Sequence, residues 1–201
     1  MPLQATRYKE ILQYPGCIVL DLPENSQAAC TVRKLRRRFD PERANIPVEI
    51  TLTGSSGIGY LKQGQPLGPI AAAIDRLASA NAPFQNAFAG KDCFPGTGIF
   101  FLTLKDEEPF CALQQQLSQE RDLQFLSSPY PFRPHCTIRL INSYKAQETD
   151  PDLSDWNAVQ VPHDSFLLQQ ISLYALMDRI HSQLLYRTVL SKNNSAGDSV
   201  L

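Results

Sequence analysis

The sequence predicts an α+β fold in which two pseudo-symmetric lobes of antiparallel sheet, with flanking helices, surround a central cleft. Strand and helix patterns follow one another in the order β-α-β-α-β-β-α-β-β-β, which is typical of such folds. A short strand pattern, x-[Glu/His]-x-Thr-[Leu/Ile], occurs once in each half, as Val48–Leu52 and as Pro134–Ile138. This internal repeat indicates two related lobes whose repeated strands face each other across the cleft.

The first half begins with an apolar strand over Gly16–Leu22 that a proline ends. A helix follows, which Ser26 or Asn25 caps and which the pair Asp40 and Pro41 ends. Its apolar positions recur at the spacing of one helix face: Ala28, Val32, Leu35 and Phe39. The charged residues of this helix are therefore expected to point outward.

The first repeated strand spans Val48–Thr53, and the glycines and serines of Gly54–Gly57 form the loop after it. A second helix is predicted over Pro66–Ala80, because Pro69 suits its first turn. The apolar stripe of this helix consists of Ile70, Ala73, Ile74, Leu77 and Ala78. Both elements belong to the first lobe.

The second half contains two strands joined by a Pro-Gly turn, then a helix, the second repeated strand and a closing hairpin. The first two strands are predicted over Pro83–Gly90 and Gly98–Lys105, and the helix starts at Asp106 with the stripe Phe110, Leu113 and Leu117. The second repeated strand is predicted over Phe132–Leu140. The closing hairpin joins Phe166–Met177 to Gln183–Leu190 around Asp178–His181. This half therefore repeats the order of strand, helix and motif strand.

Composition places the chain among globular proteins with an ordinary core. Its 201 residues are 43% hydrophobic and 19% charged, with a formal net charge of -1. Residues 1–192 are expected to form one bilobal domain, with 193–201 as a flexible tail. No stretch approaches the length of a membrane span, and a monomer is expected. Since the net charge does not favour a general nucleic-acid binder, any anion site must be local.

The five cysteines favour a reducing, cytoplasmic setting. They are widely spaced without a C-x-x-C pair, so neither a disulfide framework nor a zinc site is predicted. Cys136 lies beside His135, but strand alternation turns it to the opposite face, where it is interpreted as a core residue rather than a nucleophile.

The chemistry of the second repeat rests on two polar side chains. His135 and Thr137 are two apart in a strand, so they share a face and lie about 6.5–7 Å apart along it. They offer a proton-transfer group and a hydroxyl donor to the same ligand. In the first repeat, Glu49 stands at the position of the histidine and Thr51 at that of the threonine.

These two repeats resemble the motifs of the 2H phosphoesterase superfamily, which includes 2'-5' RNA ligase-like proteins and RNA 2',3'-cyclic phosphodiesterases. Members carry two His-x-Thr/Ser motifs, one in each lobe. Pro134–Ile138 matches the second motif, including the proline before His135. Ile46–Leu52 matches the first in its apolar flanks, its threonine and the basic helix before it, and departs at Glu49.

The resemblance implies that a cyclic phosphate lies between the motifs, at an RNA end or in a small nucleotide. It implies acid–base catalysis by His135, hydrogen bonds from Thr51 and Thr137 to phosphate oxygens, and no cofactor or metal. Glu49 occupies the place of the second catalytic group. Whether the protein is an enzyme depends on this substitution.

Glutamate at this place carries an electrostatic cost. Two unit charges 4 Å apart at an effective dielectric of 20 interact by about 4 kcal/mol, so an ionised Glu49 weakens phosphate binding. Burial that keeps Glu49 protonated, a bridging divalent cation, or an ion pair with His135 would each remove this cost. The alternative is a catalytically inactive or re-purposed member that binds a nucleotide, an RNA end or a protein.

Further candidates surround the second motif. Arg133 and Arg139 alternate onto the His135 side, where either would neutralise phosphate charge, and Arg139 could equally be a surface residue. Tyr130 and Phe132 are candidates for stacking on a base, although packing under a strand is the commoner role. The basic run at 33–38 is interpreted as a solvated helix face, with contact to RNA phosphates as the alternative. His163 and His181 are predicted to be surface residues.

Overall fold

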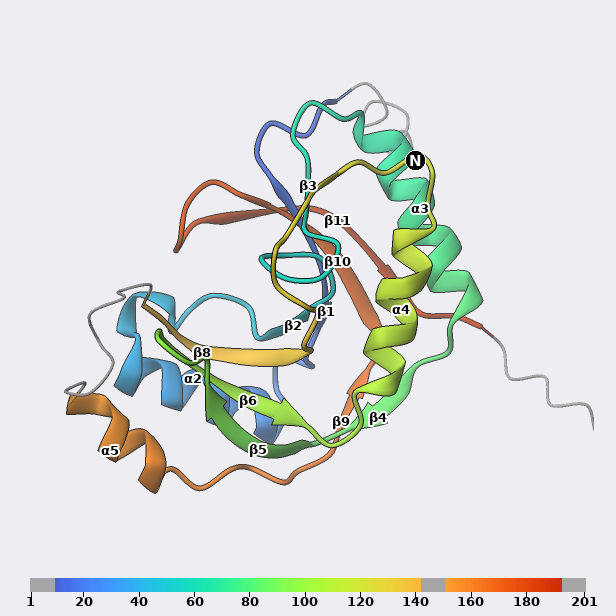
Figure 1. Cartoon of the computed structure of the whole chain (residues 1–201). Helices are drawn as coiled ribbons and strands as arrows, with labels where there is room; N and C mark the ends of the chain where they lie inside the picture. Colours follow the sequence, from blue (N-terminus) through green and yellow to red (C-terminus); the bar gives the residue numbers. More distant parts are fainter. Residues whose placement is uncertain (1–9, 142–150, 193–201) are drawn as a thin grey trace, which may run out of the picture.

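The computed structural model describes residues 10–141 and 151–192 (Figure 1). The strands are β1 (Gly16–Asp21), β2 (Glu49–Thr51), β3 (Tyr60–Leu61), β4 (Phe84–Asn86), β5 (Phe88–Cys93), β6 (Gly98–Leu104), β7 (Phe125–Leu126), β8 (His135–Ile141), β9 (Phe166–Leu168), β10 (Gln170–Leu176) and β11 (Ser182–Val189). The helices are α2 (Gln27–Phe39), α3 (Leu67–Ala80), α4 (Glu108–Ser118) and α5 (Pro151–Ala158), with a 3-10 turn η1 (Pro41–Arg43). The tail predicted at 193–201 lies outside the described residues.

The first lobe is built on a sheet of order β11-β10-β1-β3-β7, in which β2 also pairs with β1. Every pairing in it is antiparallel. The register places Glu49 opposite Asp21 and Thr51 opposite Val19. Since directly opposed residues share a face of the sheet, these four side chains lie on the same face.

The second lobe is built on the antiparallel sheet β5-β6-β8. A separate antiparallel pair is formed by β4, the strand before β5 in the chain, and β9, the next strand after β8. Strand β8 therefore belongs to a different sheet from β2. The two strands nevertheless contact each other, and Figure 1 shows them side by side near the middle of the molecule. The fold thus brings the two repeated strands together, as the pseudo-symmetry predicts.

Each helix that precedes a repeated strand packs on the other lobe. Helix α2 lies against β8, and its Phe39 ring packs edge-on to Phe100 of β6 at 5.9 Å. Helix α4 reaches the first lobe, where the side chain of Gln114 donates to the backbone oxygen of Leu52 at 3.3 Å. This exchange of helices ties the lobes into one core.

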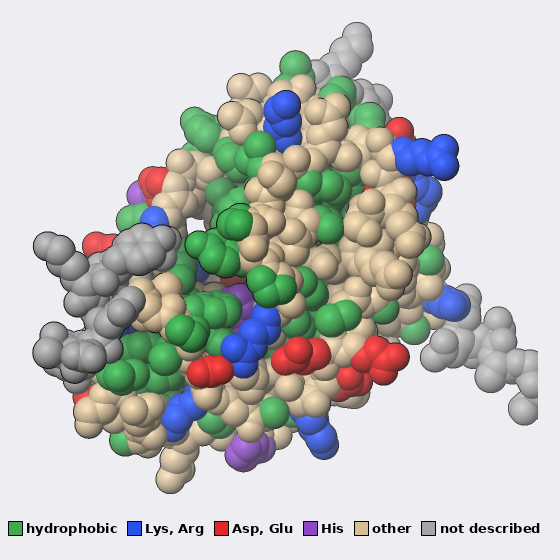
Figure 2. Space-filling model, in the orientation of Figure 1, with side chains coloured by type: hydrophobic (Ala, Val, Ile, Leu, Met, Phe, Trp, Pro, Cys, Tyr) green, Lys and Arg blue, Asp and Glu red, His purple; other side chains and the backbone are tan. Residues whose placement is uncertain are grey.

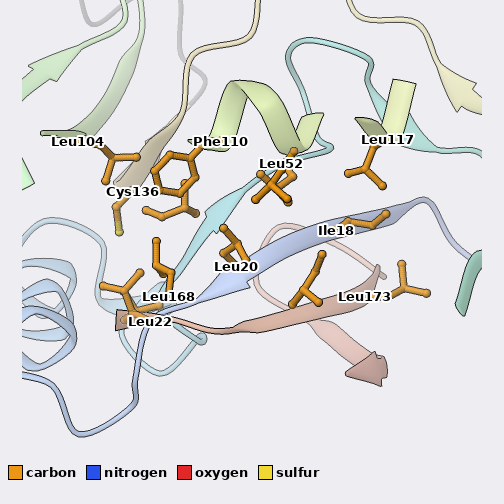
Figure 3. Packing of buried hydrophobic residues seen from close by; sticks show 14 of the residues in the cluster. Ile18, Leu20, Leu22, Leu52, Leu104, Phe110, Leu117, Cys136, Leu168 and Leu173 are labelled. Atoms are coloured by element: carbon orange, nitrogen blue, oxygen red, sulfur yellow. The ribbon is translucent and has the colours of Figure 1, made fainter. Parts of the chain in front are cut away.

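The main core lies between the first sheet and helices α3 and α4. Figure 3 shows Phe110 and Leu117 of α4 pointing toward Ile18, Leu20 and Leu52. Alternate residues of β1 enter this core, whereas Cys17 and Val19 join Tyr174 in a small second cluster on the opposite face. That opposite face is the one that carries Glu49 and Thr51.

The structure confirms most predicted elements and divides two of them. Ser26 caps α2 by accepting a hydrogen bond from the amide of Ala29 at 3.1 Å, and the hairpin around Asp178–His181 joins β10 to β11. The predicted single strands Pro83–Gly90 and Phe166–Met177 are each two strands, which pair with different partners. The elements that were not predicted are short: β3, β7, η1 and α5.

No helix among residues 10–141 and 151–192 has both the length and the apolar character needed to cross a membrane.

Candidate functional site

The first motif strand directs its polar side chains away from the main core. Ile50 and Leu52 are buried in that core, and strand alternation turns Glu49 and Thr51 to the other face. On that face Asp21, the register partner of Glu49, accepts hydrogen bonds from Ser172, Tyr174 and Arg187. Glu49 therefore lies beside a polar network that single-strand patterns in the sequence did not indicate.

The second motif strand has the same design. Cys136 and Ile138 are fully buried, and His135 and Thr137 lie on the opposite face, across from Thr103 and Phe101 of β6. The prediction that Cys136 is a core residue is confirmed, and burial raises the pKa of its thiol to about 12. Cys136 is thus a packed thiol, not a nucleophile.

His135 is held by its backbone and by aromatic rings. Its Nδ1 lies 2.7 Å from the carbonyl oxygen of Arg133, and the rings of Phe101 and Phe94 pack on it at 5.0 and 5.2 Å. A carbonyl oxygen only accepts, so Nδ1 carries the proton of the neutral ring and Nε2 is the acceptor. Burial lowers the pKa of His135, and the charge of Arg133 lowers it further, while the bond to the carbonyl opposes both effects.

A bulge in β8 overturns the predicted placement of Arg139. Thr137 pairs with Phe101 and Arg139 with Phe100, so Ile138 is an extra residue in the ladder. The extra residue reverses the alternation, and Arg139 stacks over the ring of Phe100 at 4.7 Å on the face away from His135. Sequence alternation alone placed it on the His135 side because one inserted residue exchanges the two faces.

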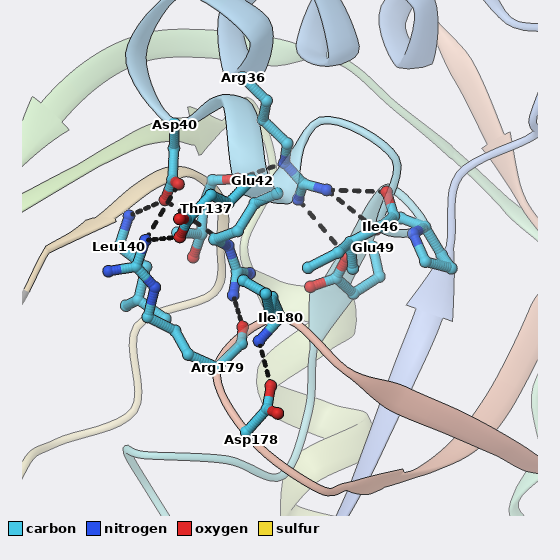
Figure 4. Close-up of polar contacts among 12 residues, drawn as sticks. Arg36, Asp40, Glu42, Ile46, Glu49, Thr137, Leu140, Asp178, Arg179 and Ile180 are labelled. Atoms are coloured by element: carbon cyan, nitrogen blue, oxygen red, sulfur yellow. Dashed lines mark hydrogen bonds and ion pairs between the residues drawn. The ribbon is translucent and has the colours of Figure 1, made fainter.

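The basic helix also differs from its predicted solvated face. Arg36 is completely buried, although Arg37 and Arg38 are exposed. Figure 4 shows its guanidinium between the two motif strands: Nε donates to the carbonyl oxygen of Thr137 at 3.0 Å, and Nη2 lies 3.5 Å from Oε2 of Glu49. The missed signal was the buried stripe of α2, where Arg36 follows Val32 by four positions and precedes Phe39 by three.

Glu49 is consequently a largely buried carboxylate whose Oε2 lies beside a fully buried counter-charge. Its side chain is 16% exposed. Burial raises the pKa of Glu49, Arg36 and Arg43 oppose this shift, and Asp21 adds to it. The ion pair predicted as one possibility is therefore formed with Arg36 and not with His135.

A cavity of about 70 Å³ adjoins Glu49 between the segment before β2 and the β10–β11 hairpin. Arg43, Tyr174 and Asp178 line it. His135 is not among its lining residues, so this cavity belongs to the first motif alone.

The segments that flank the two motifs are joined by hydrogen bonds. The amide of Gly57 donates to the carbonyl of Tyr130 at 2.9 Å, and Ser128 Oγ donates to the carbonyl of Ser55 at 2.7 Å. Gly57 has a φ of +67°, and a Cβ there would lie 1.9 Å from Nε2 of Gln114. The positive φ is what favours glycine at this position, because the end of the Gln114 side chain could move away from a Cβ.

The remaining candidates near His135 have different surroundings. Tyr130 is 61% exposed, whereas Phe132 packs partly buried against the core. Arg133 stacks over Phe101 at 4.8 Å and pairs with Asp92 at 2.9 Å. Tyr130 and Arg133 are therefore accessible to a ligand, while the ring of Phe132 is partly covered by the core.

On the face seen in Figure 2, basic and acidic side chains are interspersed. His163 and His181 are exposed, as predicted, and His181 pairs with Asp178 at 2.8 Å. Among residues 10–141 and 151–192, no group of three histidine, cysteine or acidic side chains is arranged to hold a metal ion.

Comparison with known proteins identifies a family and several solved structures that are similar to most of this chain. The family model described as the 2'-5' RNA ligase superfamily matches residues 22–173. No curated protein matches the chain.

Solved structures share the fold, and two of E. coli LigT and one of a Thermus thermophilus protein serve as examples. LigT of E. coli complexed with 3'-AMP is 21% identical and aligns over 91% of this chain and 100% of its own, with a TM-score of 0.57. LigT complexed with NADP+ is 20% identical over 90% and 99%, with a TM-score of 0.56. TT0787 of Thermus thermophilus is 19% identical over 89% and 98%, with a TM-score of 0.61.

Proposed function

Since the chain belongs to the 2'-5' RNA ligase superfamily, we propose that it binds a phosphate-bearing RNA end or nucleotide between β2 and β8 and opens a 2',3'-cyclic phosphate there. The observation that carries the proposal is the state of His135, whose Nδ1 is bonded to a carbonyl while Nε2 stays available as an acceptor. The complex of LigT with 3'-AMP is consistent with a nucleotide ligand.

His135 acts as the general base. Because its pKa is lowered, the ring is neutral near pH 7 and Nε2 can accept a proton from water. Phe101 and Phe94 fix the plane of the ring, so less orientation has to be gained when the ligand binds.

The reaction is a hydrolysis in which all atoms are accounted for. The water oxygen forms a bond to phosphorus, its proton moves to Nε2 of His135, and the bond from phosphorus to the 2' or 3' oxygen breaks. The leaving oxygen takes a proton from the carboxyl group of Glu49, whose raised pKa favours the protonated form. Proton exchange with solvent then restores both side chains.

The other candidate residues bind the substrate. The hydroxyls of Thr51 and Thr137 donate to phosphate oxygens, and Arg133 supplies positive charge beside His135. Tyr130, which is exposed, stacks on a base. In molecules whose Glu49 is ionised, Arg36 pairs with the carboxylate and so reduces its repulsion of the phosphate.

Incubation of the purified protein with an oligonucleotide that ends in a 2',3'-cyclic phosphate tests the proposal. Formation of a 2'- or 3'-phosphomonoester between pH 5 and 8, lost in His135→Ala, is the expected result. His163→Ala is the matched control because His163 is an exposed histidine of the same chain. The proposal is wrong if concentrated protein opens no cyclic phosphate at any pH in this range, with or without divalent cations.

A second candidate function is ligand binding without turnover. It is favoured by Oε2 of Glu49, which is buried against Arg36 instead of pointing to solvent. A protein of this kind would bind 3'-AMP without hydrolysing cyclic ends, and Glu49→His would give it measurable turnover. Native turnover that His135→Ala abolishes would exclude this alternative.

A further inference from the structure

Arg36 lies at the junction of the two halves of the site. Its guanidinium is 0% exposed, although burying a charge is costly unless the charge is paired and hydrogen-bonded. It donates to the carbonyl oxygens of Ile46 and Pro47, each at 3.1 Å, and of Thr137 at 3.0 Å, and it pairs with Glu49 at 3.5 Å. The bonded carbonyls come from the segment that leads into β2 and from β8.

These contacts join strands that no backbone ladder joins. β2 pairs with β1 and β8 pairs with β6, so the motif strands belong to separate sheets. A side chain with several donors in one rigid plane can fix the distance between such strands. Figure 4 shows the guanidinium of Arg36 reaching Glu49 and Ile46 from the helix above them.

A neutral counterpart occupies the other half. Gln114 of α4, the helix before the second motif, donates to the carbonyl of Leu52 just after the first motif. Arg36 of α2, the helix before the first motif, donates to the carbonyl of Thr137 in the second. Of these two side chains, the charged one, Arg36, is the one that contacts Glu49.

We propose that Arg36 is a positioning residue of the site, which holds β2 against β8 and fixes the carboxylate of Glu49 by a buried ion pair. The consequence for the reaction rests on the proposed function: Arg36 sets the pH range in which Glu49 is protonated. Arg36 touches no substrate, so it acts only through Glu49 and the strand backbones.

The test compares Arg36→Met and Arg36→Lys with Arg37→Met, a control on the exposed side of the same helix. Side-chain carbon NMR should show the pKa of Glu49 about 1–3 units higher in Arg36→Met and unchanged in Arg37→Met. Arg36→Lys keeps the charge but not the planar fork. It should therefore shift this pKa less, yet speed the exchange of β8 amide protons.

Turnover of a 2',3'-cyclic nucleotide provides the second measurement. In Arg36→Met the limb of the pH–rate profile that depends on Glu49 should move upward with the pKa seen by NMR, which a purely structural residue would not cause. Arg36→Met/Glu49→Gln removes both charges and supplies the comparison if Arg36→Met alone does not fold. If the β8 amide protons of the double variant exchange faster than those of Arg37→Met, the result supports the proposal.

Two results overturn the positioning role. One is an unchanged Glu49 pKa in Arg36→Met, and the other is β8 amide exchange in Arg36→Lys or the double variant that equals the exchange in Arg37→Met. The NMR measurements need no substrate. If they succeed while no variant and no wild type opens a cyclic phosphate, the proposed reaction fails and the positioning role stands.

Discussion

The two motif strands carry the same pattern in different surroundings, one charged and one aromatic. Glu49 is next to Arg36 and opposite Asp21, so its half of the site is built around buried charges. His135 packs against Phe101 and Phe94, which also contact each other, so its half is built around aromatic rings. Both side chains are removed from water, but only the first has a buried ionic partner.

This difference shows that the two halves of a pseudo-symmetric site can hold their polar side chains by different interactions. Desolvation without an opposite charge leaves His135 neutral and ready to accept a proton. The carboxylate of Glu49 needs the counter-charge of Arg36, because an unpaired buried anion would destabilise the fold. In the proposed reaction, the first half combines a structural link with a proton donor, and the second keeps a proton acceptor without a buried ionic partner.

The largest expected effect is the loss of the aromatic half's base. His135→Ala should reduce the rate of cyclic phosphate opening by about 10²–10⁴-fold, the range that general acid–base catalysis contributes. Steady-state turnover measures it. A loss of less than about threefold, far below that range, would show that His135 does not transfer the proton.

The next effect distinguishes Arg133, which precedes β8, from Arg139, which lies within it. Arg133→Met should weaken binding of 3'-AMP by about tenfold or more, since a hydrogen bond to a charged group contributes about 1.5–3 kcal/mol. Arg139→Met should leave this affinity unchanged, because the bulge turns Arg139 onto Phe100. Calorimetric titration measures both affinities, and equal losses would contradict the bulged register.

The pH dependence of stability should have opposite signs in the two halves. The lowered pKa of His135 means that the unfolded chain binds more protons just below pH 6.5, so stability falls as the pH drops below 6.5. The raised pKa of Glu49 means that the folded chain binds more protons just above pH 4.5, so stability falls as the pH rises above 4.5. Each fully titrating group contributes about 1.4 kcal/mol per pH unit.

Urea unfolding of His135→Gln and Glu49→Gln at several pH values separates the two contributions. Each variant should flatten the free energy of unfolding in its own pH range and leave the other range as in the wild type. For each variant, the wild-type free energy of unfolding minus that of the variant gives the contribution of the replaced side chain. If this difference changes with pH in the same direction for both variants, the two environments do not differ as described.

The smallest expected effect concerns the two threonines. Thr51→Val and Thr137→Val each remove one hydroxyl donor, so each should weaken phosphate binding by about 1 kcal/mol, or roughly fivefold. Competition by inorganic phosphate in the turnover assay measures this. If only one variant weakens binding, only that half of the site holds the phosphate.

Local sequence patterns predicted the elements that position the site. Strand alternation placed Glu49 with Thr51 and His135 with Thr137, and helix periodicity and capping placed α2 within one or two residues of its ends. The two-residue strands β3 and β7 escaped prediction because two residues show no periodicity. The bulge at Ile138 escaped for a related reason, since one extra residue leaves no mark in an alternating pattern.

By itself the sequence determined which residues share a strand face or a helix stripe, since these follow from backbone geometry over a few residues. Only the tertiary structure decided which faces meet and which charges are buried. Arg36 shows the reason: whether a guanidinium can be buried depends on partners, and its bond to Thr137 spans 101 positions of the chain. A pattern within one helix contains no information on such a partner, whereas the packed lobes supply it.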